Sequence, residues 1–392
     1  MKALKKVAIS LGIGILVLLL ASWLLWLLKP IRPLDVIIVD KSVRDYQFTS
    51  HRALTWVLNE NRFHSYKNKK YSLSKDYYGF VPLKPKNSGN YVLRRYLLSD
   101  ITELVEKNDL IYYADMYGVY FNEWYESPVT AASASKIIGG INNNDYWLLK
   151  NLYDAHKTII FEDIFFTEPT EPLVRYRTEE IVKVHPTGWS LKYFAKLDTA
   201  DKEIPHWVVS MFKKMNDGKW PFKSSGIVFI NTNKQVVVLE DKKHLDFPIP
   251  MLETAPEVAD KYKVAQSVPF YNWIEIVTAA PSYHELSSFV IKDNSAGENV
   301  LSLHGIPSKF PAVLQNDSAK MYYIAGDFSN QIMAFNTFRL NGFAALKARS
   351  LFHSDKNAFL WTYYVPFLTE VFDETANEKS ESKPDNKPDN KQ

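Results

Sequence analysis

The stretch LIYYADMYGVYF, residues 110–121, begins as an apolar run and changes character at Asp115. Residues 110–114 have the composition of a β-strand that is buried on both faces. Asp115 then stands where the strand gives way to a loop, and Tyr117 and Tyr120 follow it. In α/β sheets, ligands bind beyond the carboxyl ends of the strands. The stretch therefore predicts a central strand that carries Asp115 to the binding edge of a sheet.

Two further apolar runs, residues 34–42 and 158–166, also lead into acids, which are Asp40 in the first and Glu162 with Asp163 in the second. Amphipathic patterns typical of helices alternate with these strands at residues 49–63, 94–109, 144–157 and 167–184. This alternation predicts an α/β fold with a mostly parallel, doubly wound sheet and helices on both faces. The expected N-caps are Thr49 or Ser50 for the first helix and Asn143 or Asn144 for the third.

The second half of the chain is richer in short strands. Residues 226–240 form a hairpin pattern, and further β-rich runs cover residues 268–279, 285–293 and 321–329. A helix is expected at residues 204–216, with Pro205 near its first turn, and a last aromatic helix is expected to be broken at Pro366. We therefore expect one domain over residues 34–375, with a β-rich insertion at about residues 186–300.

The two ends of the chain are distinct from this domain. Residues 1–6 carry three lysines, and the 22 residues 7–28 carry no charge, which is long enough to cross a bilayer core of about 30 Å as a helix. The run ends in Trp and Leu, not in a small-residue cleavage site, so it predicts a transmembrane signal anchor. The basic end should remain cytoplasmic, which makes this a single-pass cell-membrane protein with an extracytoplasmic domain. Residues 376–392 are expected to be a disordered tail.

Composition excludes several classes of function. The chain contains no cysteine, which excludes disulfides, thiolate metal sites and cysteine nucleophiles. A net charge of +3 spread over 392 residues gives no sign of a nucleic-acid surface. The sequence has no metal-binding histidine motif and no nucleotide-binding glycine motif, so neither a metal nor a cofactor is expected.

The segments YYADMYGVY and IIGGINNNDYWLLKNLYDAHKTIIFED together resemble the class I glutamine amidotransferase-like, or flavodoxin-like, fold. HGIPSKFPAVLQ and KMYYIAGDFSN resemble its closing strands, so the resemblance covers about residues 34–184 and 303–330. The chain also resembles uncharacterised membrane-anchored bacterial proteins. An amidotransferase needs a cysteine nucleophile, so the missing cysteine rules out that activity, and the sequence leaves open whether the chain is an enzyme.

Candidate site residues follow from the sheet edge and from loops in which aromatic rings stand beside acids. Such pairs suit carbohydrate, because rings stack on sugar faces while carboxylates accept hydrogen bonds from hydroxyls. The candidates for ligand binding are Asp40, His51, Tyr78, Asp115, Tyr117, Tyr120, Glu162, His304 and Asp327.

The main hypothesis is a non-catalytic protein that binds an envelope polysaccharide or helps to assemble or export it, with the membrane and polysaccharide machinery as partners. One alternative is a glycan or cell-wall hydrolase that uses Asp115 and Glu162 as acid and base. Another is an interaction scaffold with a vestigial cleft.

Overall fold

Ten strands form the main sheet of the computed structural model, which describes residues 2–66, 68–84, 89–126, 135–162, 165–166, 169–200, 204–331, 333–350 and 356–381. Their order is β14-β13-β16-β17-β18-β9-β6-β2-β4-β5. Five neighbouring strands are parallel to one another: β18 (Met321–Ile324), β9 (Thr158–Glu162), β6 (Leu110–Asp115), β2 (Val36–Asp40) and β4 (Tyr78–Pro82). This block contains the three acid-ending strands expected from the sequence.

The remaining five strands run antiparallel to their neighbours, so the expectation of a mostly parallel, doubly wound sheet is wrong in extent and the sheet is mixed. They are β5 (Tyr91–Arg94), β13 (Leu245–Thr254), β14 (Ser267–Pro269), β16 (His284–Asp293) and β17 (Lys309–Asn316). Only the short turn at residues 317–320 separates β17 from β18. A connection of this length joins antiparallel strands, because a parallel crossover needs a dozen residues or more.

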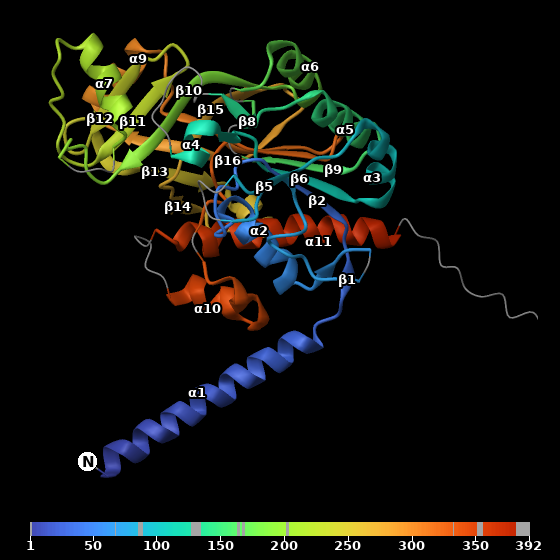
Figure 1. Cartoon of the computed structure of the whole chain (residues 1–392). Helices are drawn as coiled ribbons and strands as arrows, with labels where there is room; N and C mark the ends of the chain where they lie inside the picture. Colours follow the sequence, from blue (N-terminus) through green and yellow to red (C-terminus); the bar gives the residue numbers. More distant parts are fainter. Residues whose placement is uncertain are drawn as a thin grey trace, which may run out of the picture.

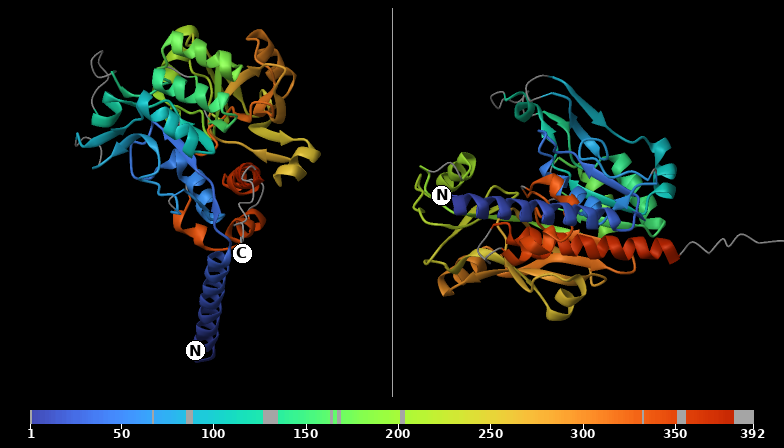
Figure 2. Two further views of the ribbon diagram at one scale, coloured as in Figure 1. Left: turned by 90° about the vertical axis from the view of Figure 1, so that its right-hand side faces the viewer. Right: turned by 90° about the horizontal axis from the view of Figure 1, so that it is seen from below.

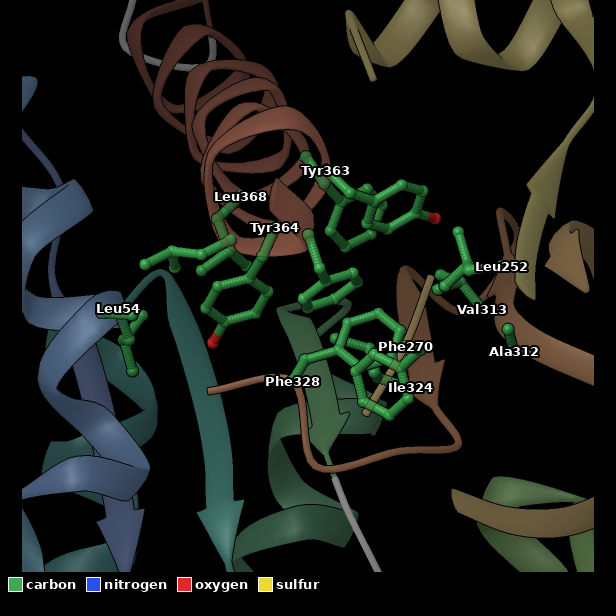
Figure 3. Close-up of a cluster of buried hydrophobic side chains, with 14 of the residues drawn as sticks. Leu54, Leu252, Phe270, Ala312, Val313, Ile324, Phe328, Tyr363, Tyr364 and Leu368 are labelled. Atoms are coloured by element: carbon green, nitrogen blue, oxygen red, sulfur yellow. The ribbon is translucent and has the colours of Figure 1, made fainter. Parts of the chain in front are cut away.

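Hydrophobic packing covers both faces of the parallel block. On one face, Val36 and Ile38 pack with α2 (Thr49–Glu60), the π-helical turn η3 (Leu360–Tyr364) and α11 (Val365–Glu381). On the other face, Ile37 and Val39 pack with α3 (Ile101–Lys107), α5 (Asn143–Asp154) and α6 (Pro172–Val182). Successive residues of a strand point to opposite faces, so an unbroken apolar run serves both cores at once. Figure 3 shows the first core, where Phe270, Phe328 and Tyr364 gather beneath the C-terminal helix.

A second, four-stranded sheet has the order β12-β11-β10-β15. Its strands are β10 (Val184–Phe194), β11 (Gly226–Asn231), β12 (Val236–Glu240) and β15 (Ile274–Ala279), and α7 (His206–Met215) packs against it. Alternate residues of β11 and β12 belong to the first core, so the second sheet also packs against the antiparallel strands of the main sheet, chiefly β13 and β17 (Figure 1). The second half of the chain thus supplies this sheet and, with β13, β14 and β16 to β18, one flank of the main sheet.

Two expected helix starts differ from the structure. The N-cap of α2 is Phe48, in a left-handed conformation, and Ser50 directs its hydroxyl toward Asp115 instead of capping the helix. The N-cap of α5 is Asn142, whose side chain accepts hydrogen bonds from the backbone of Asn144 and Asp145. The predicted N-cap of α5 is off by one residue because Asn142, Asn143 and Asn144 are consecutive and any of them could cap the helix.

The C-terminal helix is longer and more continuous than expected. Pro366 is the second residue of α11 and does not break the helix. Proline is tolerated in the first turn of an α-helix, and the π-helical turn η3 comes directly before α11. Residues 376–381, expected in the tail, form the last turns of α11. Residues 382–392 lie outside the described part of the chain, as does Asp163.

Smaller elements connect these layers. They are β1 (Arg32–Pro33), β3 (Phe63–His64), η1 (Leu98–Asp100), β7 (Val119–Tyr120), α4 (Phe121–Tyr125), β8 (Lys136–Ile138), α8 (Pro256–Tyr262), α9 (Ser295–Leu303), η2 (Phe335–Arg339) and α10 (Phe343–Ser350).

The N-terminal helix α1 (Lys2–Leu28) projects from the domain, as Figures 1 and 2 show. The segment Leu4–Leu28 contains an 18-residue window with a mean hydropathy of 2.5 and is long and apolar enough to cross a membrane. The last turns of the helix nevertheless belong to the domain. Trp26 is 1% exposed and donates its indole N–H to the backbone carbonyls of Asn59 and Glu60 at the end of α2.

Candidate functional site

The carboxyl ends of β2, β6, β9 and β18 lie side by side at one edge of the main sheet. Asp40 of β2 is in register with Asp115 of β6, and Glu162 ends β9. The loop after β18 returns along the same edge and carries Asp327. The three expected strand-end acids Asp40, Asp115 and Glu162, together with Asp327, therefore come from four neighbouring strand ends. Asp40 and Asp327 are near enough to raise the pKa of Asp115, and Asp327 is near enough to raise that of Glu162.

Asp40 and His51 form a buried pair. The Nδ1 atom of His51 lies 2.6 Å from Oδ2 of Asp40, and the two side chains are 1% and 0% exposed. The other ring nitrogen, Nε2, lies 2.9 Å from the carbonyl oxygen of Leu73. A carbonyl oxygen can only accept, so Nε2 carries a proton and a second proton lies between Nδ1 and Oδ2. The Asp40–His51 pair ties the end of β2 to α2 and to the loop at Leu73.

Asp115 is held by hydroxyl and backbone donors. Ser42 donates its hydroxyl to Oδ1 at 2.6 Å, and the backbone N–H of Tyr117 donates to the same oxygen at 2.9 Å. Burial raises the pKa of Asp115 to about 7, the negative charge of Asp40 adds to this rise, and the two hydrogen bonds oppose it. Asp115 is thus a carboxyl group that titrates near neutral pH.

Glu162 is fully buried and its two oxygens are both occupied. Tyr112 and Tyr364 donate their hydroxyls to Oε2, the latter at 3.0 Å, and the backbone N–H of Ser329 donates to Oε1. Burial raises the pKa of Glu162 to about 8, against the effect of the hydrogen bonds from Tyr112 and Ser329. Glu162 therefore joins β6, the C-terminal helix and the loop after β18 around one carboxyl group.

Asp327 lies in the loop that covers Glu162. Its Oδ2 accepts a hydrogen bond of 2.8 Å from the side chain of Asn330, and its backbone is tied to Trp273 and Asn272. Burial raises the pKa of Asp327 to about 6, while Asn330 and the charge of Lys192 lower it. The next residue, Phe328, is buried in the first core, so the loop is anchored over the edge.

A small cavity of about 40 Å³ opens beside the end of β2. Tyr78, Arg95 and the start of α5 line it, together with Lys41. Lys41 is buried and donates to Asp145 at 2.5 Å and to the carbonyl of Gly140 at 2.7 Å. Lys41 therefore points away from Asp40 and fastens β2 to the N-terminus of α5.

Aromatic side chains form a surface next to Asp115, which we call the aromatic rim and define as Tyr117, Tyr120, Phe121 and Tyr125. Tyr117 and Phe121 are 41% and 40% exposed. The rings of Tyr117 and Tyr120 lie 5.4 Å apart, and those of Phe121 and Tyr125 lie 4.3 Å apart. The rim follows directly from the end of β6, so the residues of the opening stretch lie together.

All of the predicted site residues except His304 fall into three places. Asp40, His51, Asp115, Glu162 and Asp327 share the edge, Tyr117 and Tyr120 belong to the rim, and Tyr78 lines the small cavity. His304 lies elsewhere: it is exposed at the C-terminal end of α9 and its ring lies 6.2 Å from that of Trp189. Within the described part of the chain, no group of three or more His, Asp or Glu side chains is arranged to hold a metal ion.

Several residues of the edge were not expected from the sequence. Ser42 comes two residues after Asp40, and its hydroxyl donates to Asp115 at the end of the neighbouring strand. Its position just after a strand end could have suggested this hydrogen bond from the sequence. Tyr112 and Tyr364 carry no such signal, because Tyr364 approaches Glu162 from a helix 202 residues further along the chain. Lys41 and Asp145 likewise meet across 104 residues.

Comparisons with known proteins give a limited result. No protein-family model matches the chain, and no curated protein matches it. Similar solved structures include a putative ThuA-like protein from Bacteroides uniformis ATCC 8492, with 10% identity and a TM-score of 0.35 over 78% of this chain and 88% of that chain. A putative ThuA-like protein from Parabacteroides merdae ATCC 43184 has 11% identity and a TM-score of 0.34 over 80% and 88%. ThuA-like proteins have the class I glutamine amidotransferase-like fold, but likenesses at these scores support no conclusion about activity.

Proposed function

We propose that this chain is a membrane-anchored, non-catalytic protein that binds an envelope polysaccharide through the aromatic rim and Asp115. The observation that carries the proposal is the contrast at the sheet edge between Asp40 and Glu162, which are 0% exposed, and the exposed rings that lie beside the half-buried carboxyl group of Asp115. Stacked or neighbouring tyrosines with a carboxylate acceptor suit the apolar faces and hydroxyls of sugars.

The state of Glu162 supports a binding role over catalysis. A general acid or base must reach the reacting group within hydrogen-bond distance. Glu162 is 0% exposed and both of its oxygens accept hydrogen bonds from the protein. Asp40 is likewise 0% exposed and bound to His51. Neither acid is exposed to a substrate. Asp115 is half-buried beside the rim, and among the described residues its Oδ2 has only a long contact of 3.5 Å with the hydroxyl of Ser50.

The N-terminal helix supports retention at the membrane. Trp26 is 1% exposed, packs against Phe338 at 5.6 Å between ring centroids, and bonds to the end of α2. Cleavage after α1 would remove this side chain from the domain core. The lysines at residues 2, 5 and 6 favour a cytoplasmic N-terminus, which assigns the domain to the extracytoplasmic side.

The test uses the full chain in detergent micelles on an array of bacterial envelope glycans. A bound polysaccharide is expected, and Tyr117→Ala should weaken its affinity about five-fold, because one ring contact contributes about 1 kcal/mol. Trp207→Ala is the matched control, since Trp207 is 51% exposed on α7 outside the rim. Absence of any bound glycan, or equal affinity in the Tyr117→Ala variant, would overturn the proposal.

A second candidate function is glycan hydrolysis with Asp115 as the general acid or base. The observation that favours it is the pKa of about 7 that burial gives Asp115, a value suited to proton transfer at neutral pH. The two functions separate in one experiment with a bound glycan. Depolymerisation by the wild-type chain, lost in an Asp115→Asn variant that keeps its glycan affinity, would establish hydrolysis.

A further inference from the structure

The N-terminal helix contacts one more part of the domain, residues 333–350, which contain η2 and α10. Ser22 donates its hydroxyl to the carbonyl of Asn341 at 2.9 Å, and the backbone N–H of Asn341 donates to the carbonyl of Ser22 at 3.3 Å. Further along α1, an apolar groove of about 600 Å³ separates the helix from η2. Its walls are Leu16, Leu19, Leu20 and Trp23 on one side and Ala334–Thr337, Arg339 and Leu340 on the other.

This contact lies far down the helix. At a rise of 1.5 Å per residue, Ser22 is about 9 Å and Leu16 about 18 Å from Leu28 along the axis. The uncharged run of residues 7–28 is about 33 Å long, close to the thickness of a bilayer core of about 30 Å. If α1 spans the membrane with residues 7–28, Leu19, Leu20 and Trp23 lie within the leaflet on the side of the domain, and Leu16 lies near the centre of the bilayer. Residues 333–350 must then reach the level of the lipid headgroups.

The chemistry of residues 333–350 suits that level. Leu346 of α10 is 65% exposed. Residues 331–350 contain Arg339, Lys347 and Arg349 and no acid at all. Lys70 lies near both Arg339 and Arg62, and the cationic groups of Lys70 and Arg62 lie over the indole of Trp26 at the C-terminal end of α1. Apolar side chains beside a purely basic cluster are typical of an element that lies in an anionic membrane interface.

We propose that residues 333–350 form a second membrane contact, in which α10 and η2 lie at the boundary between headgroups and acyl chains. An acyl chain of a neighbouring phospholipid occupies the groove beside α1, and anionic headgroups neutralise Arg339, Lys347 and Arg349. The inference rests on the proposed anchoring of α1 in the membrane. Together, α1 and this second contact hold the domain against the bilayer at two points, which fixes the orientation of the aromatic rim relative to the membrane.

Figures 1 and 2 agree with this placement, since α10 lies on the side of the domain from which α1 extends. A protein partner is the competing occupant of the same surface. The absence of acids over residues 331–350 and the continuity of the groove with the apolar face of α1 favour lipid.

The natural absence of cysteine permits a direct test with single spin labels on the full chain. The labelled variants are Leu346→Cys, Val17→Cys in the centre of α1, and Leu303→Cys as the control, because Leu303 is 84% exposed on α9. Each protein is reconstituted in vesicles of phosphatidylcholine and phosphatidylglycerol. Collision rates with oxygen, which enters the bilayer, and with a water-soluble nickel complex are then measured. The oxygen-to-nickel ratio should be at least about five-fold higher at residue 346 than at residue 303.

The outcomes separate this inference from the anchoring on which it rests. A water-like ratio at residue 17 would show that α1 does not span the bilayer and would remove both proposals. A membrane-like ratio at residue 17 with a water-like ratio at residue 346 would overturn the second contact alone. Protection of residue 346 from both oxygen and nickel would indicate a protein cover and would also overturn it.

The role of the basic residues is tested separately. In the Leu346→Cys background, the triple change Arg339→Gln, Lys347→Gln and Arg349→Gln should abolish the increase in the ratio on adding phosphatidylglycerol to phosphatidylcholine vesicles. The matched control replaces three exposed lysines of the α7 region, Lys213, Lys214 and Lys219, by glutamine and should keep the increase. An unchanged increase in the first triple variant would refute the assignment of anionic headgroups to these residues.

Discussion

Glu162 is the residue at which three parts of the chain meet. Its carboxyl group accepts from Tyr112 on β6, Tyr364 on the C-terminal helix and Ser329 in the loop after β18. Burial of a carboxyl group favours the uncharged form, which accounts for its pKa of about 8. An acid that is neutral at pH 7 and wholly enclosed serves the structure of the edge, whereas Asp115, with a pKa of about 7, remains beside the aromatic rim.

Replacing Glu162 by glutamine should remove a pH dependence of stability. The pKa rises from 4.5 to about 8 on folding, so the native state binds more protons than the unfolded state between these values. The free energy of unfolding therefore falls as pH rises from about 4.5 to 8, by at most about 1.4 kcal/mol per pH unit from this group. Urea denaturation at pH 5 and pH 8 should show a smaller fall for Glu162→Gln than for the wild type. Glu103→Gln, at an exposed position, should follow the wild type.

Parallel pH profiles for the wild type and the Glu162→Gln variant would contradict this account of Glu162. The comparison between variants matters because the pKa of Glu275 is also raised by burial, to about 7, and contributes a fall of the same sign in both proteins.

At the scale of elements, the N-terminus of α5 is fastened to β2 by a buried ion pair. Lys41 and Asp145 have side chains that are 5% and 3% exposed, and Tyr96 donates its hydroxyl to the other oxygen of Asp145. Asp145 also accepts from the backbone N–H of Asn142, the N-cap. A carboxylate at the first turn of a helix interacts favourably with its dipole. One side chain thus serves the cap, the ion pair and the wall of the small cavity.

The change Lys41→Met should destabilise the domain by about 3–5 kcal/mol, because it leaves the carboxylate of Asp145 buried without its counter-charge. A double variant with Asp145→Asn should recover part of this loss, and chemical denaturation of the four proteins gives the coupling energy. The control is Lys150→Met, which breaks a solvent-exposed pair with Asp154 on the same helix and should leave the free energy of unfolding essentially unchanged. Additive effects of the two buried substitutions would count against the pair.

The three acid-ending strands of the parallel block, β2, β6 and β9, could be predicted from the sequence, because each is an unbroken apolar run with an acid at its end. The antiparallel flank could not, since the order of elements does not reveal that the turn at residues 317–320 reverses the chain. The hydrogen-bond partners of the acids also could not be predicted from local sequence patterns. His51 bonds to the backbone of Leu73, and Glu162 to Tyr364, and such contacts depend on where distant segments pack.

At the scale of the whole molecule, α1 belongs to the domain as well as to the proposed membrane span. Its last turns place Trp26 between the end of α2 and Phe338. Arg62 donates to the carbonyls of Leu27 and Lys29 and so satisfies backbone acceptors at the end of the helix. These contacts make a stiff junction between helix and domain.

Trp26→Ala should lower the free energy of unfolding of the domain by about 3–5 kcal/mol, the usual range for loss of a large buried aromatic side chain. Trp23 is the matched control, because it lies one turn away and is 40% exposed, so Trp23→Ala should have little effect on the domain. Chemical unfolding of the full chain in detergent micelles, followed by near-ultraviolet circular dichroism, measures both. Equal stability of the two variants would mean that α1 ends outside the domain.

The position of α11 has a consequence for how the protein is made. Asp373 of this last helix pairs with Arg32, 341 residues earlier, and Lys379 binds Asp35 and Asp109. The core that covers β2 and β6 therefore stays open until the final segment of the chain arrives. The extracytoplasmic placement proposed above requires the chain beyond α1 to cross the membrane almost completely before this core can close. In that placement folding is a late event, and apolar strands of the domain are exposed during translocation.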